Sequence, residues 1–151
     1  MIGLLQRVTS AWVEVDSRRV GQIDVGLMVL IGVERGDEAA QADRLLERLL
    51  TYRVFADEEG RMNRSLKDVG GGLLLVPQFT LAADTRKGTR PGFSPAAEPA
   101  DGRKWFEYLL RQARNAHPVV QSGVFGADMQ VTLTNDGPVT FWLRVDPTSA
   151  A

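Results

Sequence analysis

The 151-residue sequence predicts a single layered α/β domain with two mainly antiparallel β-sheets and two main helices. Three observations lead to this prediction. The chain begins and ends with pairs of strand-like segments joined by short polar stretches, a pattern typical of antiparallel hairpins. Two continuously apolar segments of strand length and two amphipathic helical patterns lie between these pairs. The length suffices for one domain, so we expect the domain to span residues 1–146 and a frayed tail to span residues 147–151.

The first third of the chain is expected to contain three strands and one helix. Residues 2–15 show the mixed alternation of a strand, and residues 20–25 return as a second strand after a polar turn. Residues 27–33 are apolar throughout, which is typical of a central strand covered on both faces. A helix is expected from Asp37, a residue type that caps helix N-termini, to about Tyr52.

The remainder is expected to contain one buried strand, one helix and a terminal hairpin. In order, we expect a turn over 57–60, a loop over 61–71, a strand over 73–76, an ordered functional loop over 82–99, a helix over 100–116 and strands over 129–134 and 139–145. The two last strands are joined by residues 135–138, so we expect them to pair with each other.

Composition excludes several classes of function. The net charge of −1 argues against non-specific binding of long nucleic acid, although a local patch would still suffice for a short RNA end. The absence of cysteine removes thiolate nucleophiles, disulfides and cysteine metal sites, and one histidine gives no metal cluster. No signal peptide or membrane-length apolar run is visible. We therefore expect a cytoplasmic protein without metal, cofactor or membrane contact.

Gln78 and Thr80 follow the buried strand over 73–76 and form the first candidate site. Residues i and i+2 of a strand share a face, so both side chains are expected to project toward one site. An amide and a hydroxyl donate hydrogen bonds to a carbonyl oxygen or oxyanion in acyl-transfer sites. Two interpretations stay open at this point: ordinary polar groups at a strand end, or donors of an active site.

Gly137 and Pro138, within Asn135–Thr140, form the second candidate site. The residue types around them are those of a hairpin turn, which is the simpler interpretation. Proline directly after glycine at the start of a strand is unusual, because proline removes a donor from the ladder. Proline is also the residue for which a cis peptide bond costs least, so this pair can direct two carbonyl groups in a way that ordinary chain cannot.

Arg7 and His117 are the next candidates, and each has a structural alternative. Arg7 lies within an apolar strand, either as an edge residue with its head in solvent or as a ligand-binding residue. His117 precedes a proline at the expected end of a helix, so we interpret it as a residue of the helix C-terminus rather than a catalytic base.

Phe125 and the basic residues of the 82–99 loop are also open to two interpretations. Phe125 is either a core residue or a platform on which a base stacks. Arg86, Lys87 and Arg90 are either solvated loop residues or contacts to phosphate groups.

Taken together, these residues resemble the bacterial-type D-aminoacyl-tRNA deacylases, also called the D-tyrosyl-tRNA deacylase family, over nearly the whole chain. The matching segments are 1–8, 26–34, 52–55, 60–63, 78–84, 90–94, 125–131 and 135–140. Two signature blocks at matching separation, 78–84 and 135–140, make this resemblance specific.

The resemblance implies an α/β/β layered fold, a homodimer and an active site at the subunit interface. It also implies that the Gly137–Pro138 bond is cis and that this pair enters the partner subunit's pocket. There its carbonyl groups would crowd the α-carbon of the bound aminoacyl group. A D-residue or glycine would present only a hydrogen to them, whereas an L-residue would present its side chain, so discrimination would work by exclusion.

The resemblance also assigns the other site residues. Gln78, Thr80 and the backbone of Phe79 would hydrogen-bond the ester carbonyl. Phe125 and Met129 match the positions around the terminal adenine of tRNA, and Arg7 would lie beside the pocket.

Position 77 departs from the family. Most members have serine where this chain has Pro77, and an animal group of tRNA deacylases with altered chiral selectivity also has proline there. Phe79 and Val139–Thr140 nevertheless follow the D-specific pattern.

The resemblance predicts hydrolysis of the ester between a D-amino acid, or glycine, and the 3′ end of tRNA. Two alternatives are a non-catalytic module that binds the aminoacyl-tRNA end and an acyl hydrolase that uses Thr80 as its nucleophile. We prefer Thr80 as an orienting donor, because the motif contains no base to deprotonate it.

Overall fold

The structure is a computed structural model that describes residues 1–147. The elements in order are β1 (Ile2–Val15), β2 (Arg18–Ile23), β3 (Gly26–Gly32), α1 (Ala39–Thr51), β4 (Phe55–Ala56), β5 (Met62–Arg64), α2 (Leu66–Val69), β6 (Gly72–Pro77), the 3₁₀ helix η1 (Phe79–Ala82), α3 (Pro99–Ala116), β7 (Val120–Ser122) and β8 (Gln130–Arg144). Residues 148–151 of the expected tail lie outside the described residues.

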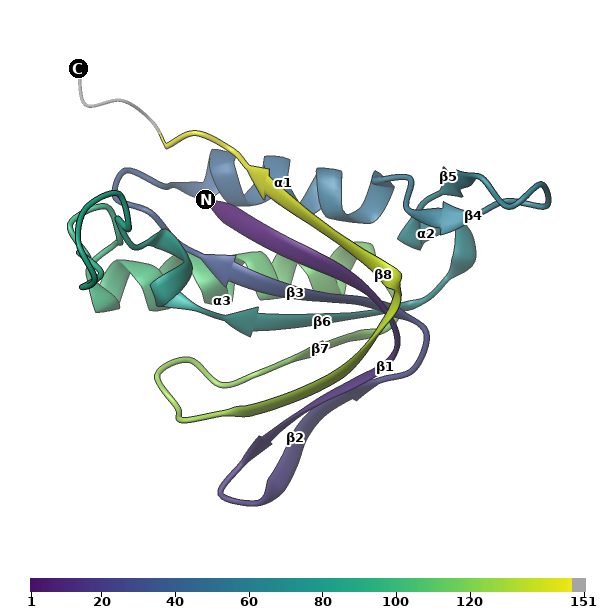
Figure 1. Ribbon diagram of the computed structural model, residues 1–151, viewed down its shortest axis with the longest axis horizontal. Coiled ribbons are helices and arrows are strands. Elements are labelled where there is room, and N and C mark those ends of the chain that lie inside the picture. The colour runs from purple at the N-terminus through teal and green to yellow at the C-terminus, as the bar shows by residue number, and fades with distance from the viewer. Residues whose placement is uncertain (148–151) are drawn as a thin grey trace.

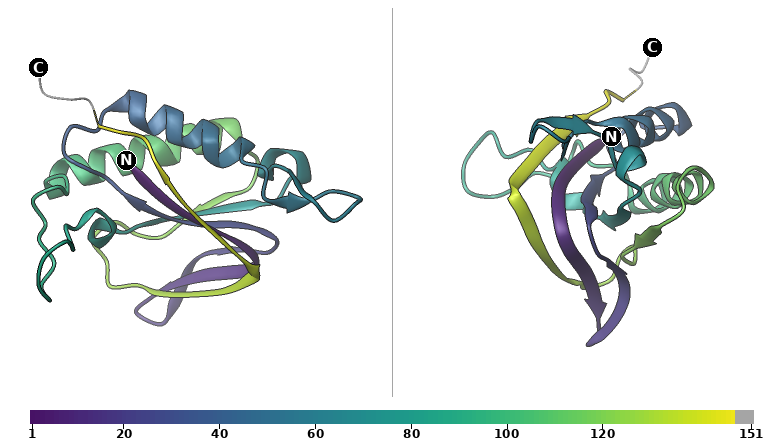
Figure 2. Two further views of the ribbon diagram at one scale, coloured as in Figure 1. Left: turned by 45° about the horizontal axis from the view of Figure 1, so that its top comes forward. Right: turned by 90° about the vertical axis from the view of Figure 1, so that its right-hand side faces the viewer.

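The α/β class, the two sheets and the two main helices are confirmed. The larger sheet has the order β2-β1-β3-β6-β7, and β8 pairs with β1 off this path. Its β3–β6 and β6–β7 pairs are parallel, and the other pairs are antiparallel. The second sheet contains only β4 and β5. Both long helices lie on the same face of the larger sheet (Figures 1 and 2).

The central strands β3 and β6 are buried on both faces, as their continuous apolar sequence predicts. Leu27, Val29 and Ile31 belong to the main core, which includes the buried residues of α1 and α3. The alternate residue Met28 contacts a second apolar cluster, which contains Val8 and other residues of β1. This second cluster exists because the sheet curls, so that β1, β2 and β8 cover the face opposite the helices (Figure 2).

The expected hairpin at the end of the chain is wrong. Residues 130–144 form one strand that pairs with β1 along nearly its whole length. Gln6 pairs with Thr140 and Val8 pairs with Asn135, so the four residues 136–139 bulge out opposite the single residue Arg7. The residues of this segment favour a turn locally, but the long edge of β1 is a partner for both halves, so the turn residues become a bulge.

Two local expectations of the first half are also corrected. The 61–71 segment is not a loop throughout, since it contains β5 and the one-turn helix α2, which Ser65 caps. The N-cap of α1 is Glu38, in a capping box with Gln41, rather than Asp37. Asp37 is buried and accepts hydrogen bonds from the α-ammonium group of Met1 at 2.8 Å and from the backbone of Glu34 at 2.7 Å. The Asp37 carboxylate therefore neutralises the buried ammonium group of Met1 instead of capping α1.

The helices of the described residues give no membrane span. Within residues 1–147, no helix is both long and apolar enough to cross a bilayer.

Candidate active site

Gln78 and Thr80 come together through a tight turn. The strand β6 ends at Pro77, and the Gln78 N–H then donates to the carbonyl of Ile31 at 2.8 Å, which fixes the start of the turn on β3. The chain continues as η1, and the Gln78 side-chain amide donates to the hydroxyl oxygen of Thr80. The expected strand geometry is therefore wrong for this pair, although the two side chains do meet.

This hydrogen bond determines whether the Thr80 hydroxyl can donate to a ligand. Its hydroxyl oxygen accepts from Gln78, so its own proton remains available for donation to a ligand oxygen. The structure shows no hydrogen bond or ion pair between Thr80 and a histidine, lysine or carboxylate within the described residues. The pair is therefore equipped to donate hydrogen bonds, and Thr80 has no base that would activate it as a nucleophile.

Phe79 is the exposed member of this turn. Its side chain is 60% exposed, and its ring lies 5.3 Å from that of Phe93, which is 42% exposed. Large exposed aromatic rings are unusual unless they contact a ligand or a partner. Phe93 was absent from the residues assigned by sequence, and its signal is weak because it is a lone aromatic residue between glycine and serine.

Two cavities flank the 77–79 segment. One, of about 280 Å³, is lined on its far side by Pro99 and Gly102 of α3 and by Phe125. The other, of about 270 Å³, is lined on its far side by Asp128 and Met129. The sequence-predicted residues Gln78, Phe79, Phe125 and Met129 therefore surround one region of the surface, as expected.

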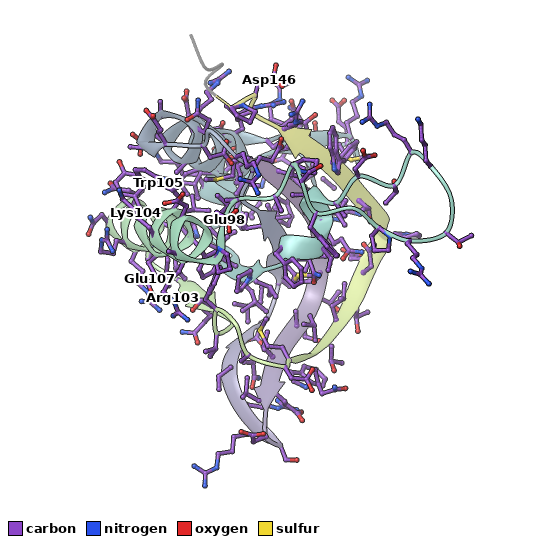
Figure 3. The ribbon with its side chains drawn as sticks, turned by 90° about the vertical axis from the view of Figure 1, so that its left-hand side faces the viewer. Glu98, Arg103, Lys104, Trp105, Glu107 and Asp146 are labelled. Carbon is purple, nitrogen blue, oxygen red and sulfur yellow. The ribbon has the colours of Figure 1, made fainter. Side chains whose placement is uncertain are left out.

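Phe125 and Met129 are both half-buried, so each combines a packing role with a face toward a cavity. Phe125 packs against the core residue Phe106, and the guanidinium of Arg103 lies 4.9 Å from its ring centroid. The sulfur of Met129 accepts a hydrogen bond from the backbone of Val124 at 3.4 Å. Figure 3 shows Arg103 beside Glu107 on α3, and the two side chains form an ion pair at 3.6 Å. Sequence reasoning missed Arg103, which only the tertiary structure brings to Phe125.

The second signature block forms the bulge of β8. The Gly137–Pro138 peptide bond is cis, as predicted, and both residues are exposed. Asn135 closes the bulge with its side chain, whose amide donates to the hydroxyl of Thr140 at 2.8 Å and accepts from the Val139 N–H at 2.9 Å. The hydrogen bonds of the Asn135 side chain therefore fix the conformation of the bulge, which projects from the edge of the sheet.

Arg7 holds the bulge from the side of β1. Its Nη1 donates to the carbonyl of Val54 at 2.7 Å, and its Nε donates to the carbonyl of Asp136 at 3.1 Å. The Asp136 carboxylate adds an ion pair at 3.5 Å. Neither cavity beside Gln78 is lined by Arg7. Within one chain, Arg7 thus positions the bulge that contains Gly137. Arg7 would lie beside the substrate pocket, as expected, only if that pocket is formed together with a second subunit.

Gly137 leaves no room for a side chain. Its φ of +131° is a conformation that L-residues rarely adopt. An added Cβ would lie 2.7 Å from Cγ2 of Val139 and 3.2 Å from a guanidinium nitrogen of Arg7. The bulge in this form therefore requires glycine.

The structure does not bring the two signature blocks together within one chain. The bulge lies opposite Arg7, which pairs with Leu27, and Leu27 pairs with Leu73. Gln78 lies five residues beyond Leu73 along the strand direction and three strands away from β8, which corresponds to roughly 20 Å along the sheet. In Figure 1 the bend of β8 lies at the right-hand end of the sheet, and β6 ends at the left.

His117 is the C-cap residue of α3, as the sequence suggests. Its Nε2 lies 2.6 Å from the carbonyl oxygen of Gly71, at the start of β6, whereas Gln78 follows the end of that strand. Among residues 1–147, no three histidine or acidic side chains gather closely enough to hold a metal ion.

A family model described as D-Tyr-tRNA(Tyr) deacylase matches residues 4–144, and this range includes both signature blocks. The chain belongs to this family. A D-aminoacyl-tRNA deacylase of Stutzerimonas stutzeri is 66% identical over 95% of this chain and 99% of its own length. Another from Thioalkalivibrio sulfidiphilus is 64% identical over 97% of this chain and 99% of its own length.

Two solved structures share the fold of this chain. The c-Myc DNA unwinding element binding protein has a TM-score of 0.93 and 34% identity, covering 97% of this chain and 99% of its own. A probable eukaryotic D-amino acid tRNA deacylase has a TM-score of 0.80 at 19% identity, covering 95% and 98%, and that likeness concerns the fold alone. Both solved structures therefore share the layered fold over nearly the whole of this chain.

Proposed function

We propose that this chain hydrolyses the ester bond between a D-amino acid and the 3′ end of tRNA, and so recycles mischarged tRNA. Family membership and the high identity to curated deacylases support this function. The structural observation that carries it is the Gln78–Thr80 turn, in which Gln78 lines both cavities and hydrogen-bonds the hydroxyl of Thr80, which lines neither.

The chemistry asked of the protein is modest. An aminoacyl ester is already activated, so positioning of the carbonyl, stabilisation of the developing oxyanion and a water molecule suffice. The hydroxyl of Thr80, the amide of Gln78 and the backbone beside Phe79 would orient the ester carbonyl. The ribose 2′-hydroxyl of the substrate would assist the attacking water, because within residues 1–147 no base contacts Thr80. Phe125 and Met129 would bind the terminal adenine from the two cavities.

We further propose that the active site is completed by a second copy of this chain. Within one chain the two signature blocks lie far apart along the sheet, so a site that uses both needs the bulge of a partner subunit. The strand β8 is a sheet edge that also exposes Phe141 and Trp142, the latter by 56%. Exposed aromatic residues next to the bulge suit a homodimer interface.

In such a dimer, the Gly137 and Pro138 carbonyl groups would face the α-carbon of the aminoacyl group. A hydrogen fits there, as in a D-residue or glycine, and an L side chain does not. Arg7 would then act through the bulge that it holds. Because its substrate is aminoacyl-tRNA, we place the protein in the cytoplasm.

A single-turnover deacylation assay with matched D-tyrosyl-, L-tyrosyl- and glycyl-tRNA tests the function. We expect the D-ester and the glycyl ester to be cleaved and the L-ester to survive. Binding of the D-ester without cleavage would favour the non-catalytic module. An acyl adduct on Thr80 in mass spectrometry would favour the covalent hydrolase.

A further inference from the structure

The loop between η1 and α3 forms a basic hollow outside the site described above. A cavity of about 300 Å³ is lined by Asp84, Arg86, Lys87, Arg90 and Gly92. Residues 84–92 carry three cationic side chains and one carboxylate, a local net charge of +2 in a chain whose net charge is −1. A hollow lined by several cations suits an anionic ligand.

The base of this loop is fixed by the backbone. Asp84 and Gly92 form an antiparallel bridge in which each N–H donates to the other residue's carbonyl, at 2.7 and 2.9 Å. The Arg35 side chain donates to the carbonyl of Ser94 at 2.5 Å, which ties the returning strand of the loop to the end of β3. Figures 2 and 3 show the loop projecting from the body of the molecule, and Figure 2 shows it on the side opposite the long helices.

Of the three cationic side chains in the loop, only Arg86 is paired with a carboxylate within the described residues. Arg86 donates through Nε and Nη2 to the two carboxylate oxygens of Asp84, at 2.9 and 2.8 Å. Lys87 and Arg90 are exposed, and the structure shows no hydrogen bond or ion pair for their side chains within residues 1–147. Two exposed cations in the same hollow thus have no protein counter-charge in the described part of the chain and are free to pair with an anion.

The loop is directly connected to the candidate active site. It begins two residues after Ala82, the last residue of η1, and Phe93 follows it and packs against Phe79 with its ring tilted by 49°. Phe79 lines both cavities that flank Gln78. A single-stranded RNA end bound at Gln78 would therefore leave the site past two exposed aromatic rings toward the basic hollow.

We propose that the 84–92 loop, through Lys87 and Arg90, binds backbone phosphates of the tRNA acceptor end while the terminal aminoacyl-adenosine occupies the active site. This inference rests on the proposed function. Exposed rings for stacking beside cations for phosphates are the combination by which proteins bind single-stranded RNA ends. An acidic protein surface would use the cations but would have no need of the ring pair, so the arrangement favours RNA.

The test compares two substrates that differ only in the RNA body. D-tyrosyl-tRNA carries the backbone phosphates, and 3′-O-(D-tyrosyl)adenosine carries none. For Lys87→Gln/Arg90→Gln we expect KM for D-tyrosyl-tRNA to rise by about 5–20-fold and the cleavage of the adenosine ester to be unchanged. The matched control is Lys67→Gln/Arg114→Gln, which removes one lysine and one arginine from exposed positions at the other end of the sheet.

The salt dependence of binding to uncharged tRNA gives a readout that does not need activity. Loss of two phosphate contacts should reduce the slope of log affinity against log salt by about 1.4–1.8, and the control should keep the wild-type slope. Inorganic phosphate at equal ionic strength should not displace the tRNA if the ligand is a polynucleotide backbone.

Each outcome bears on a different claim. An unchanged KM and slope in the loop variant, or an equal loss on both substrates, would overturn the phosphate contact. Equal displacement of tRNA by polyglutamate would assign the hollow to an acidic polypeptide. A wild-type protein that cleaves neither ester would remove the proposed function, and the binding slope would then decide the loop's role by itself.

Discussion

At the scale of the residue, the candidate site uses side chains for geometry rather than for strong chemistry. The side chains of Gln78 and Thr80 hydrogen-bond each other, and Arg7 and Asn135 both serve to hold the bulge that carries Gly137. Hydrogen-bond donors held in place by turns and backbone contacts are the parts that an activated ester requires.

For Thr80→Ala we expect much of the turnover to survive. The substitution removes one donor, and neighbouring donors remain, so the loss should be below the 10²–10³-fold that is typical of one oxyanion donor, at about 10-fold. Single-turnover deacylation of D-tyrosyl-tRNA measures it. Replacing the substrate's 2′-hydroxyl with hydrogen should cost more than the protein substitution. Complete loss in Thr80→Ala together with full activity in Thr80→Ser would instead indicate a nucleophile.

For Arg7→Ala we expect weaker discrimination between D- and L-esters. The guanidinium makes two hydrogen bonds to backbone carbonyls, at Val54 and Asp136, and each charge-assisted bond contributes about 1.5–3 kcal/mol. Without them the bulge gains freedom, and the exclusion of L-residues should fall by at least about 10-fold. The ratio of single-turnover rates on the two esters measures this effect.

Arg7→Lys is the matched variant, because it keeps the charge but lacks the fork that spans the two carbonyls. It should fall between wild type and Arg7→Ala. An Arg7→Ala protein that folds normally and still rejects L-tyrosyl-tRNA as well as wild type does would contradict the positioning role.

At the scale of the element, ion pairs connect the end of β8 to the segment after β3 and to the N-terminus before β1. Arg144 of β8 forms a two-point ion pair with Glu34, at 2.9 and 2.7 Å, and the Met1 ammonium lies 3.7 Å from the same carboxylate. Burial opposes the ionisation of Glu34, but the hydrogen bond from Arg144 and the ammonium charge outweigh it, so the pKa lies below its ordinary value of 4.5. The pKa of Asp37 is shifted in the opposite direction, upward, mainly by burial.

For Arg144→Gln we therefore expect a loss of stability that depends on pH. A lowered pKa in the folded state means that ionised Glu34 stabilises the fold above pH 4.5 and that this contribution is lost as pH falls through the folded pKa. At pH 7 the variant should lose about 1–3 kcal/mol, a figure reduced because Arg144 is 40% exposed. Urea unfolding at pH 7 and at pH 3.5 measures the difference, which should shrink at the lower pH.

Asp37 is present in both proteins, and its burial opposes ionisation in each. Arg44→Gln is the control, since Arg44 and its partner Glu47 are both largely exposed and their pair should contribute little. A difference between wild type and Arg144→Gln that is the same at both pH values would contradict the role given to Glu34.

At the scale of the whole molecule, the two signature blocks lie at opposite ends of one sheet, and we propose that each is one half of a site. Each half is locally complete, since Arg7 and Asn135 fix the bulge and the contact to Ile31 fixes the turn. Two copies arranged about a two-fold axis would form two equivalent sites, each with one half from either chain.

Mixing two inactive variants tests this arrangement. We expect Gln78→Ala/Thr80→Ala and Gly137→Ala to be inactive or nearly so as separate homodimers. When they are co-expressed with different tags, random pairing makes half of the dimers mixed, and each mixed dimer has one unaltered site. About one quarter of the sites should then regain wild-type activity.

Sedimentation and circular dichroism on each variant serve as controls for assembly and folding. Absence of rescue in a mixed dimer isolated through both tags would show that the two blocks do not share a site across subunits. A monomer at assay concentration would exclude the arrangement altogether.

The sequence by itself determined much of this protein. The apolar runs at β3 and β6, the amphipathic patterns of α1 and α3, and the two signature blocks are local signals, and the structure has the corresponding elements. The cis Gly137–Pro138 bond and the grouping of Gln78, Phe79, Phe125 and Met129 were also expected from the resemblance.

The tertiary structure decided what depends on distant partners. Residues 135–138 have the composition of a hairpin turn. They form a bulge because the segments on both sides of them pair with the same strand, β1, and Arg7 then holds the bulge. Asp37 is a residue type that caps helices, but here its carboxylate binds the buried ammonium group of Met1, and Glu38 is the N-cap. In both cases a contact between segments far apart in sequence contributes more free energy than the local preference, which single-sequence patterns cannot reveal.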